Sequence, residues 1–239
     1  MKKLFCLPLV ALALVTIALG QTRRHPRPAA TPPAGVPVKP GTGLTSTTLP
    51  WQKGEVSGRT YTNKSLGFEI TFPDEWLIPG DDFEAYMRSK GFDLGLKAPD
   101  SLPPTTKVKL NAALKKVQVL QTAYRSMPGS ADNAIIRISA EDLTPNPQIK
   151  DAVDYVDAVR SLYATMKLPM DFKYSDTQAE ELRNKKQFAF LDTTEREGKK
   201  RMYVTVRDGV AILFTISYKK PEDLETLRGV LGTGNFKLQ

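Results

Sequence analysis

Cysteine and histidine are almost absent: the chain of 239 residues contains one of each. Cys6 lies in an apolar segment near the N-terminus, so the remaining chain has no thiol for a disulfide, a cysteine nucleophile or a thiolate zinc site. His25 lies among arginines in a proline-rich segment. A Ser-His-Asp triad and a histidine metal cluster are therefore excluded from the expected folded part.

Motifs that bind phosphate or calcium, or that activate a serine, are also missing. The sequence has no Asp-x-Asp-x-Asp-Gly loop and no Gly-x-Ser-x-Gly segment. "LGTGNF" at 231–236 follows a predicted helix, so we interpret it as a helix end and a turn. We expect no catalytic residue, no metal ligand and no cofactor. Paired carboxylates occur mostly at turns and helix starts, where capping explains them: Asp74-Glu75, Asp81-Asp82, Glu141-Asp142, Glu180-Glu181 and Glu222-Asp223.

Residues 1–20, "MKKLFCLPLVALALVTIALG", have the pattern of a secretory signal peptide. Two lysines precede an apolar run, and the small residues Ala18 and Gly20 fit a cleavage site before Gln21. The alternative is an uncleaved anchor, but a membrane-spanning helix needs about 20 apolar residues and Pro8 interrupts this run. We therefore predict a periplasmic or secreted protein with no stable membrane span after cleavage.

Residues 21–58 are rich in proline and threonine and poor in bulky apolar side chains, which predicts a disordered linker. The linker acts either as a spacer or as a passive connection. Most of the formal net charge of +8 lies ahead of Arg59: seven of the 34 basic residues but only one of the 26 acidic residues precede it, leaving +2 for the rest. This near balance and the predicted export argue against a nucleic-acid partner.

The globular domain is expected at 59–239, and the segment "GFEITFPDEW" at 67–76 lies near its start. Phe68, Ile70 and Phe72 alternate with polar residues, which predicts a strand with one buried face. Pro73 lacks an amide hydrogen and ends the strand. The turn that follows should bring Trp76 back over the same apolar face.

Periodicity and turn residues predict four helices, at 81–90, 103–116, 146–169 and 219–232. In the third, we expect Asn146 as the N-cap and Pro147 as the first helical residue. Its buried stripe is predicted to be Ile149, Val153, Val156, Tyr163 and Met166. Strands joined by tight turns must be antiparallel, so the pattern predicts an α+β fold on an antiparallel sheet. The other strands are expected at 61–62, 117–124, 132–143, 172–175, 187–194, 201–207 and 210–218.

Three segments resemble the PsbP-like family, which includes the extrinsic photosystem II subunit and many exported bacterial proteins. They are "YTNKSLGFEITFPDEW", "NAIIRISAEDL" and the C-terminal run from "FLDTTEREGKKRMYVTV" to "LRGVLGTGNF". The resemblance implies an α/β/α sandwich with a central antiparallel sheet. It supplies no active site, and characterised members of the family act by docking to other proteins.

Five basic residues are expected to lie together at one end of the C-terminal hairpin. The strands before and after the Asp208-Gly209 turn are antiparallel, so the start of the first lies beside the end of the second. Acidic residues nearby allow the alternative of a solvated edge of mixed charge. The functional interpretation is that these residues form a surface that docks an acidic protein or an acidic envelope surface. We call these residues the basic rim: Lys199, Lys200, Arg201, Lys219 and Lys220.

We therefore expect a noncatalytic exported domain that binds or scaffolds another envelope protein. Two alternatives stay open: a small-ligand carrier, and an enzyme with a carboxylate-based pocket that the sequence does not reveal. Convergent carboxylates of shifted pKa in a deep pocket would favour the enzyme, and an apolar cavity without them would favour the carrier.

Overall fold

The computed structural model describes residues 51–80, 82–98, 102–196 and 198–236. The predicted signal peptide and most of the predicted linker lie outside these residues. No helix among the described residues is long and apolar enough to cross a membrane.

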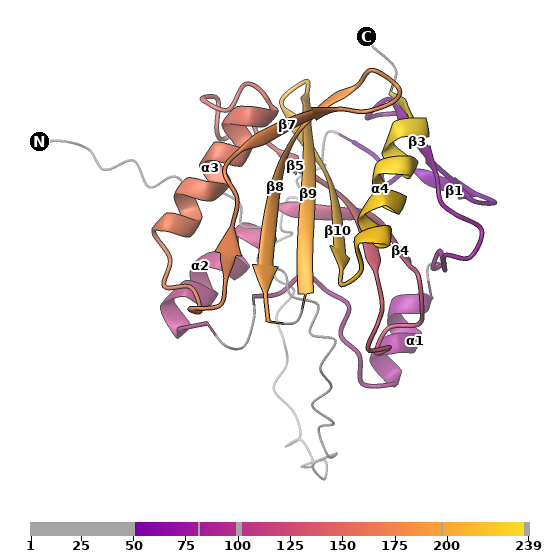
Figure 1. The fold of residues 1–239 in the computed structure, drawn as a ribbon, viewed down its shortest axis with the longest axis horizontal. Coiled ribbons are helices and arrows are strands. Elements are labelled where there is room, and N and C mark those ends of the chain that lie inside the picture. Colours follow the sequence, from indigo (N-terminus) through magenta and orange to yellow (C-terminus); the bar gives the residue numbers. More distant parts are fainter. Residues whose placement is uncertain (1–50, 81, 99–101, 197, 237–239) are drawn as a thin grey trace, which may run out of the picture.

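The centre of the fold is a large antiparallel sheet (Figure 1). Its strands follow the order β4-β5-β10-β9-β8-β6, and β7 pairs with β8 beside β6. A register shift between Val119 and Gln121 marks a bulge in the edge strand β4. The strands are β4 (Val117–Tyr124), β5 (Ile135–Asp142), β6 (Lys173–Tyr174), β7 (Gln178–Glu181), β8 (Gln187–Glu195), β9 (Gly198–Arg207) and β10 (Val210–Tyr218).

A smaller antiparallel sheet has the order β1-β2-β3-β11. It combines the start of the described chain with its last described strand, because β11 (Asn235–Phe236) pairs with β3 (Phe68–Thr71). The other two strands are β1 (Glu55–Ser57) and β2 (Thr60–Asn63).

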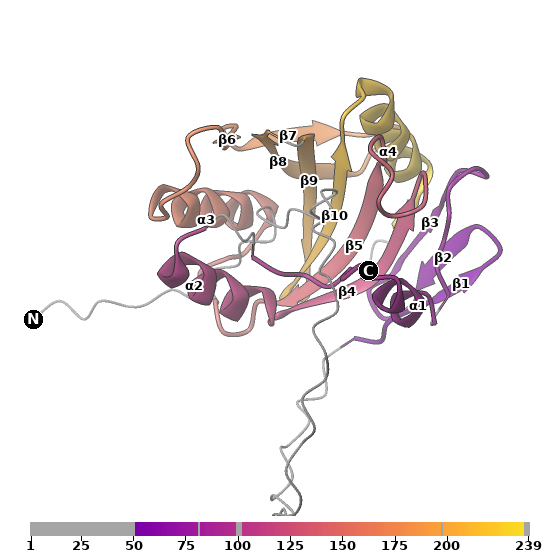
Figure 2. The same cartoon turned by 90° about the horizontal axis from the view of Figure 1, so that it is seen from below.

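The two faces of the large sheet are covered by different elements (Figure 2). Helices α2 (Pro104–Leu114) and α3 (Ala152–Ala164) pack on one face, around buried Leu191, Val204 and Leu213. Helix α4 (Pro221–Thr233) and the small sheet cover the other face. Helix α1 (Phe83–Ser89) lies near the end of β4, where Phe83 contacts Tyr124 at 5.8 Å between ring centroids. The predicted α+β class with antiparallel sheets is confirmed.

The N-terminal aromatic strand and the C-terminal strands share one core, as predicted. Phe68 meets Phe214 of β10 edge to face at 5.4 Å between ring centroids. Trp76 is 2% exposed in the same cluster. The side chain of Arg59 donates hydrogen bonds to the carbonyl oxygens of Pro73 and Trp76, so it fastens the turn between the strand and the tryptophan.

The fold begins earlier than the expected boundary at residue 59. Trp51 is 4% exposed, and its indole Nε1 donates a hydrogen bond to Gln118 Oε1 at 2.6 Å. Strand β1 also precedes Arg59 and pairs with β2. Linker-like composition did not reveal these residues because all three residues of β1 are exposed and show no apolar alternation.

The third helix begins later than expected. Asp151 is its N-cap, and its carboxylate accepts hydrogen bonds from the backbone of Val153 and Asp154. Asn146 lies in the preceding turn, so its assignment as the cap was wrong. Within the predicted stripe, Val156 and Tyr163 are buried as expected but Val153 is 43% exposed. Val153 lies within the helix but to the side of its buried face, which Tyr155, Val156, Val159 and Tyr163 form.

Candidate functional site

Strand register brings the basic rim to one end of the β9–β10 pair, as expected. Lys199 lies opposite Tyr218, and Arg201 lies opposite Ile216. Lys219 and Lys220 follow directly after β10. The backbones of all five residues are therefore neighbours.

Their side chains do not form one continuous patch. Lys200 is 6% exposed and pairs with Glu195 at 2.7 Å. Lys219 Nζ donates to the carbonyl oxygen of Ala131 at 2.6 Å, and Lys220 pairs with Asp132 at 2.5 Å. These two lysines thus reach the turn between β4 and β5 and remain exposed, as does Lys199.

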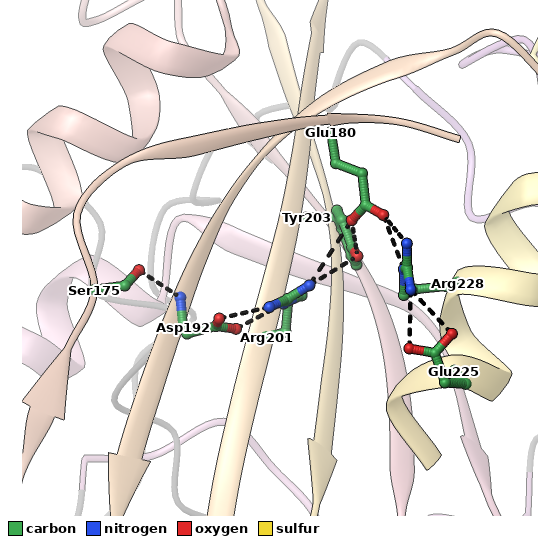
Figure 3. A network of polar contacts seen from close by, with 7 residues as sticks. All are labelled: Ser175, Glu180, Asp192, Arg201, Tyr203, Glu225 and Arg228. Carbon is green, nitrogen blue, oxygen red and sulfur yellow. Dashed lines mark hydrogen bonds and ion pairs between the residues drawn. The ribbon is translucent and has the colours of Figure 1, made fainter. Parts of the chain in front are cut away.

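Arg201 is the centre of a polar network on the α4 side of the large sheet (Figure 3). Its guanidinium lies over the Phe190 ring at 4.1 Å from the centroid. The Nε and Nη2 atoms donate to the two carboxylate oxygens of Asp192 at 2.7 and 2.6 Å. This bidentate pairing and the ring beneath it fix the orientation of the planar group.

The network continues from Arg201 to β7 and α4 (Figure 3). Tyr203 accepts a hydrogen bond from Arg201 at 3.3 Å and donates one to Glu180 at 2.7 Å. Arg228 of α4 also donates to Glu180, and it pairs with Glu225 at 2.9 Å. Glu180 therefore links the outer strand β7 to both β9 and α4.

The network does not titrate near neutral pH at its phenol or its guanidinium groups. Burial is the main cause that raises the pKa of Tyr203 to about 12. Burial acts to lower the pKa of Arg201, but its hydrogen bonds and charge interactions with Asp192 and Tyr203 together outweigh burial and raise the pKa above its ordinary value. Hydrogen bonds to Glu225 and Glu180 likewise raise the pKa of Arg228. A general acid or base works best with a pKa near the operating pH, so these groups suit fixed recognition better than proton transfer.

Sequence reasoning identified Arg201 but missed its partners. Asp192 could have been predicted as a partner of Arg201 from the register of the hairpin. Strands β8 and β9 pair Glu195 with Gly198, and this register places Asp192 opposite Arg201. Glu180 gave no such signal, since β7 is a polar strand without alternation and was not predicted.

A second group of interest lies on the opposite face of the sheet. Tyr155 of α3 donates a hydrogen bond to Glu141 Oε2 at 2.8 Å, and both side chains are 0% exposed. Burial raises the pKa of Glu141 to about 8. Such a carboxyl is the kind of group an acid–base enzyme uses, but full burial keeps it from contact with a substrate in this conformation. Among the described residues, no group of three or more His, Cys, Asp or Glu side chains could hold a metal ion.

The geometry defines an α+β domain with antiparallel sheets and a partly exposed polar network. No protein-family model and no curated protein matches the chain. The structure is similar to the solution structure of cyanobacterial PsbP (CyanoP) from Synechocystis sp. PCC 6803, with 13% identity and a TM-score of 0.38. That match covers 83% of this chain and 100% of the other.

A crystal structure of a protein from Bacteroides thetaiotaomicron VPI-5482 is also similar, with 9% identity and a TM-score of 0.37. The match covers 77% of this chain and 50% of the other, so the chain corresponds to about half the length of that protein. At these identities the likeness concerns the fold alone.

Proposed function

We propose that this protein is a noncatalytic exported domain that binds another envelope protein. Export rests on the signal-peptide pattern of residues 1–20, and the linker up to Trp51 would hold the domain at a distance from its attachment or exit point. A partner with an acidic surface fits the charge of the docking end described below.

The observation that carries the proposal is the group of exposed lysines at one end of β9 and β10. Lys199, Lys219 and Lys220 are all exposed there. The contacts of Lys219 with Ala131 and of Lys220 with Asp132 hold these two side chains in place. Exposed ion pairs are weak in water, so an acidic partner can exchange with Asp132 at little cost.

The Arg201 network supports this role because it makes the adjacent surface rigid. It joins β7, β8, β9 and α4 through charge-assisted hydrogen bonds. A pre-organised surface loses less conformational entropy on binding. Its pKa values favour fixed charges over proton transfer, as described above, which agrees with a binding role.

The test is site-specific photo-crosslinking in the native envelope. A photo-reactive amino acid replaces Lys199 in one variant and Asp208 in the control, since Asp208 lies in the turn at the opposite end of the same two strands. We expect one defined crosslinked protein from position 199 and none from position 208. Equal crosslinking from both positions, or none from either, would contradict the proposal.

Charge reversal provides the second measurement. The triple variant Lys199→Glu, Lys219→Glu, Lys220→Glu carries the photo-reactive amino acid at Ser217, because position 199 is now glutamate. This variant should lose the crosslink. A matched triple reversal at the exposed residues Lys109, Lys115 and Lys150 changes the net charge equally and should keep it. Turnover of a substrate by the purified domain would favour the enzyme alternative.

A further inference from the structure

The methionines of this chain differ widely in their exposure to solvent. Met87 and Met202 are 2% and 1% exposed, and Met166 is partly buried against the core below α3. Met127 is 47% exposed. Met170 is 102% exposed, which makes it the most accessible methionine in the part of the chain that the structure describes. Its thioether is therefore in direct contact with reagents in solution.

The turn before β6 explains why Met170 stays exposed. After the end of α3 the chain reaches β6 through a turn in which the backbone N–H of Phe172 donates to the carbonyl oxygen of Pro169 at 3.0 Å. Phe172 is buried and meets Tyr163 of α3 edge to face at 5.4 Å between ring centroids. The aromatic pair thus anchors one end of the turn. Met170, the second residue of the turn, has its side chain in solvent.

Met170 lies at the same end of the large sheet as the exposed lysines of the basic rim. Lys173 of β6 pairs with Thr194 of β8, and Thr194 pairs in turn with Lys199 of β9. Two strand spacings, about 10 Å in total, therefore separate β6 from β9 in this row. Because β6 runs antiparallel to β8, the turn that precedes β6 lies at the end of the sheet where β8 turns into β9.

We propose that Met170 is a site of reversible oxidation to methionine sulfoxide by hydroperoxides. The sulfur lone pair attacks one oxygen of hydrogen peroxide, the O–O bond breaks, and the second oxygen leaves as water with both protons. The sulfur loses two electrons and the peroxide gains them. Full exposure means that this step needs no opening of the fold. Methionine sulfoxide reductases restore the thioether, and a residue in an exposed turn is accessible to them.

The test is oxidation of the full chain by limiting hydrogen peroxide, with each methionine followed over time by peptide mass spectrometry. Met170 should oxidise fastest and Met127 second. Met87 and Met202 should react at least about tenfold more slowly than Met170, because they become accessible only when the core opens. The same reaction in urea supplies the rate of each methionine in the unfolded chain. If Met170 does not have the highest rate relative to its rate in urea, the proposal is overturned.

Two variants assign the fast step to a residue. Met170→Leu keeps an apolar side chain of similar volume at a position without packing, so its Tm should be unchanged and the fastest oxidation step should be lost. Met127→Leu is the matched control and should retain that step. A fast step that survives in Met170→Leu would contradict the assignment.

The location of Met170 gives its oxidation a consequence for docking, and this consequence rests on the proposed function. A sulfoxide is polar where the thioether is apolar, so oxidation changes the surface beside the exposed lysines. Crosslinking from position 199 should decrease after peroxide treatment, whereas it should persist in Met170→Leu treated in the same way. A crosslink that survives oxidation of Met170 would overturn this consequence and leave docking intact. Absence of the crosslink even without peroxide would instead contradict the docking role, while the rates by mass spectrometry test the oxidation site separately.

Discussion

The hydroxyl of Tyr155 lies 2.8 Å from Glu141 Oε2, where α3 packs against β5 in a fully buried part of the core. The pair joins a helix to the sheet that it covers. Because the carboxyl is buried, it is held mainly in its protonated form at neutral pH, with its pKa raised from 4.5 to about 8.

Stability should therefore depend on pH through Glu141. Between about pH 4.5 and 8 the folded chain holds a proton that the unfolded chain has released, so the contribution of Glu141 to stability decreases as pH rises through this window. The slope should approach about 1.4 kcal/mol per pH unit for this group. Urea unfolding at several pH values measures it. Glu141→Gln should flatten the profile, whereas Glu75→Gln, at an exposed turn, should leave it unchanged.

Loss of the Arg201–Asp192 pair should destabilise the fold. The two side chains are 16% and 31% exposed, so the pair is partly shielded from water. We expect Arg201→Met to lower the free energy of unfolding by about 2 kcal/mol, and a double-mutant cycle with Asp192→Asn to show coupling. The more exposed pair Arg88–Glu84 serves as control and should show coupling of about 0.5 kcal/mol or less. Equal coupling in both pairs would contradict this interpretation.

Trp51 should contribute to stability although it precedes the expected domain boundary. Trp51→Ala removes a buried ring and should cost about 3 kcal/mol in denaturant unfolding. Trp51→Phe keeps part of the packing although it loses the donor to Gln118, so it should cost less than Trp51→Ala. If Trp51→Ala left the free energy of unfolding unchanged, the folded unit would begin after this residue.

Two glycines with positive φ should differ in their response to alanine. Gly209 has φ +73°, and a Cβ there meets open space, so Gly209→Ala should cost about 1 kcal/mol through backbone strain alone. Gly67 has φ +68°, and a Cβ there would clash with the guanidinium of Arg207. Gly67→Ala should therefore cost more, because Arg207 must leave the carbonyl oxygens of Leu66 and Gly67. Chemical denaturation of both variants compares them directly.

Local patterns identified most elements correctly where burial alternates along the chain. Phe68 and Ile70 are buried while Glu69 and Thr71 are exposed, as a strand with one buried face requires. The hairpin at Asp208-Gly209 likewise fixed the pairing of β9 with β10 and hence the neighbours of Lys199. Strands β1, β7 and β11 were missed because each is short and mostly exposed, and such strands are defined by hydrogen bonds to their neighbours.

The contacts of the candidate sites were harder to predict from the sequence than the fold. Arg201 and Lys200 are adjacent in sequence, yet one joins the network beside α4 and the other pairs with Glu195 on the opposite face. The alternation of side chains along a strand predicts that these two residues face opposite sides of the sheet. Which carboxylates lie near them on each face depends on segments distant in sequence. Glu180 reaches Arg228 across 48 residues of chain, a contact without any local signal.

By itself, the sequence determined the absence of thiol and imidazole chemistry from the folded part, the periodicity of its main helices and strands, and the antiparallel hairpins. These follow from residue type and local spacing, which do not need distant partners. Only the tertiary structure decided that Trp51 belongs to the core, that most of the basic rim is engaged in internal contacts, and that Arg137 is buried beside the carbonyl oxygen of Leu94. Burial and pairing depend on which segments pack together, and that packing alone sets the local dielectric environment that makes a charge costly or useful.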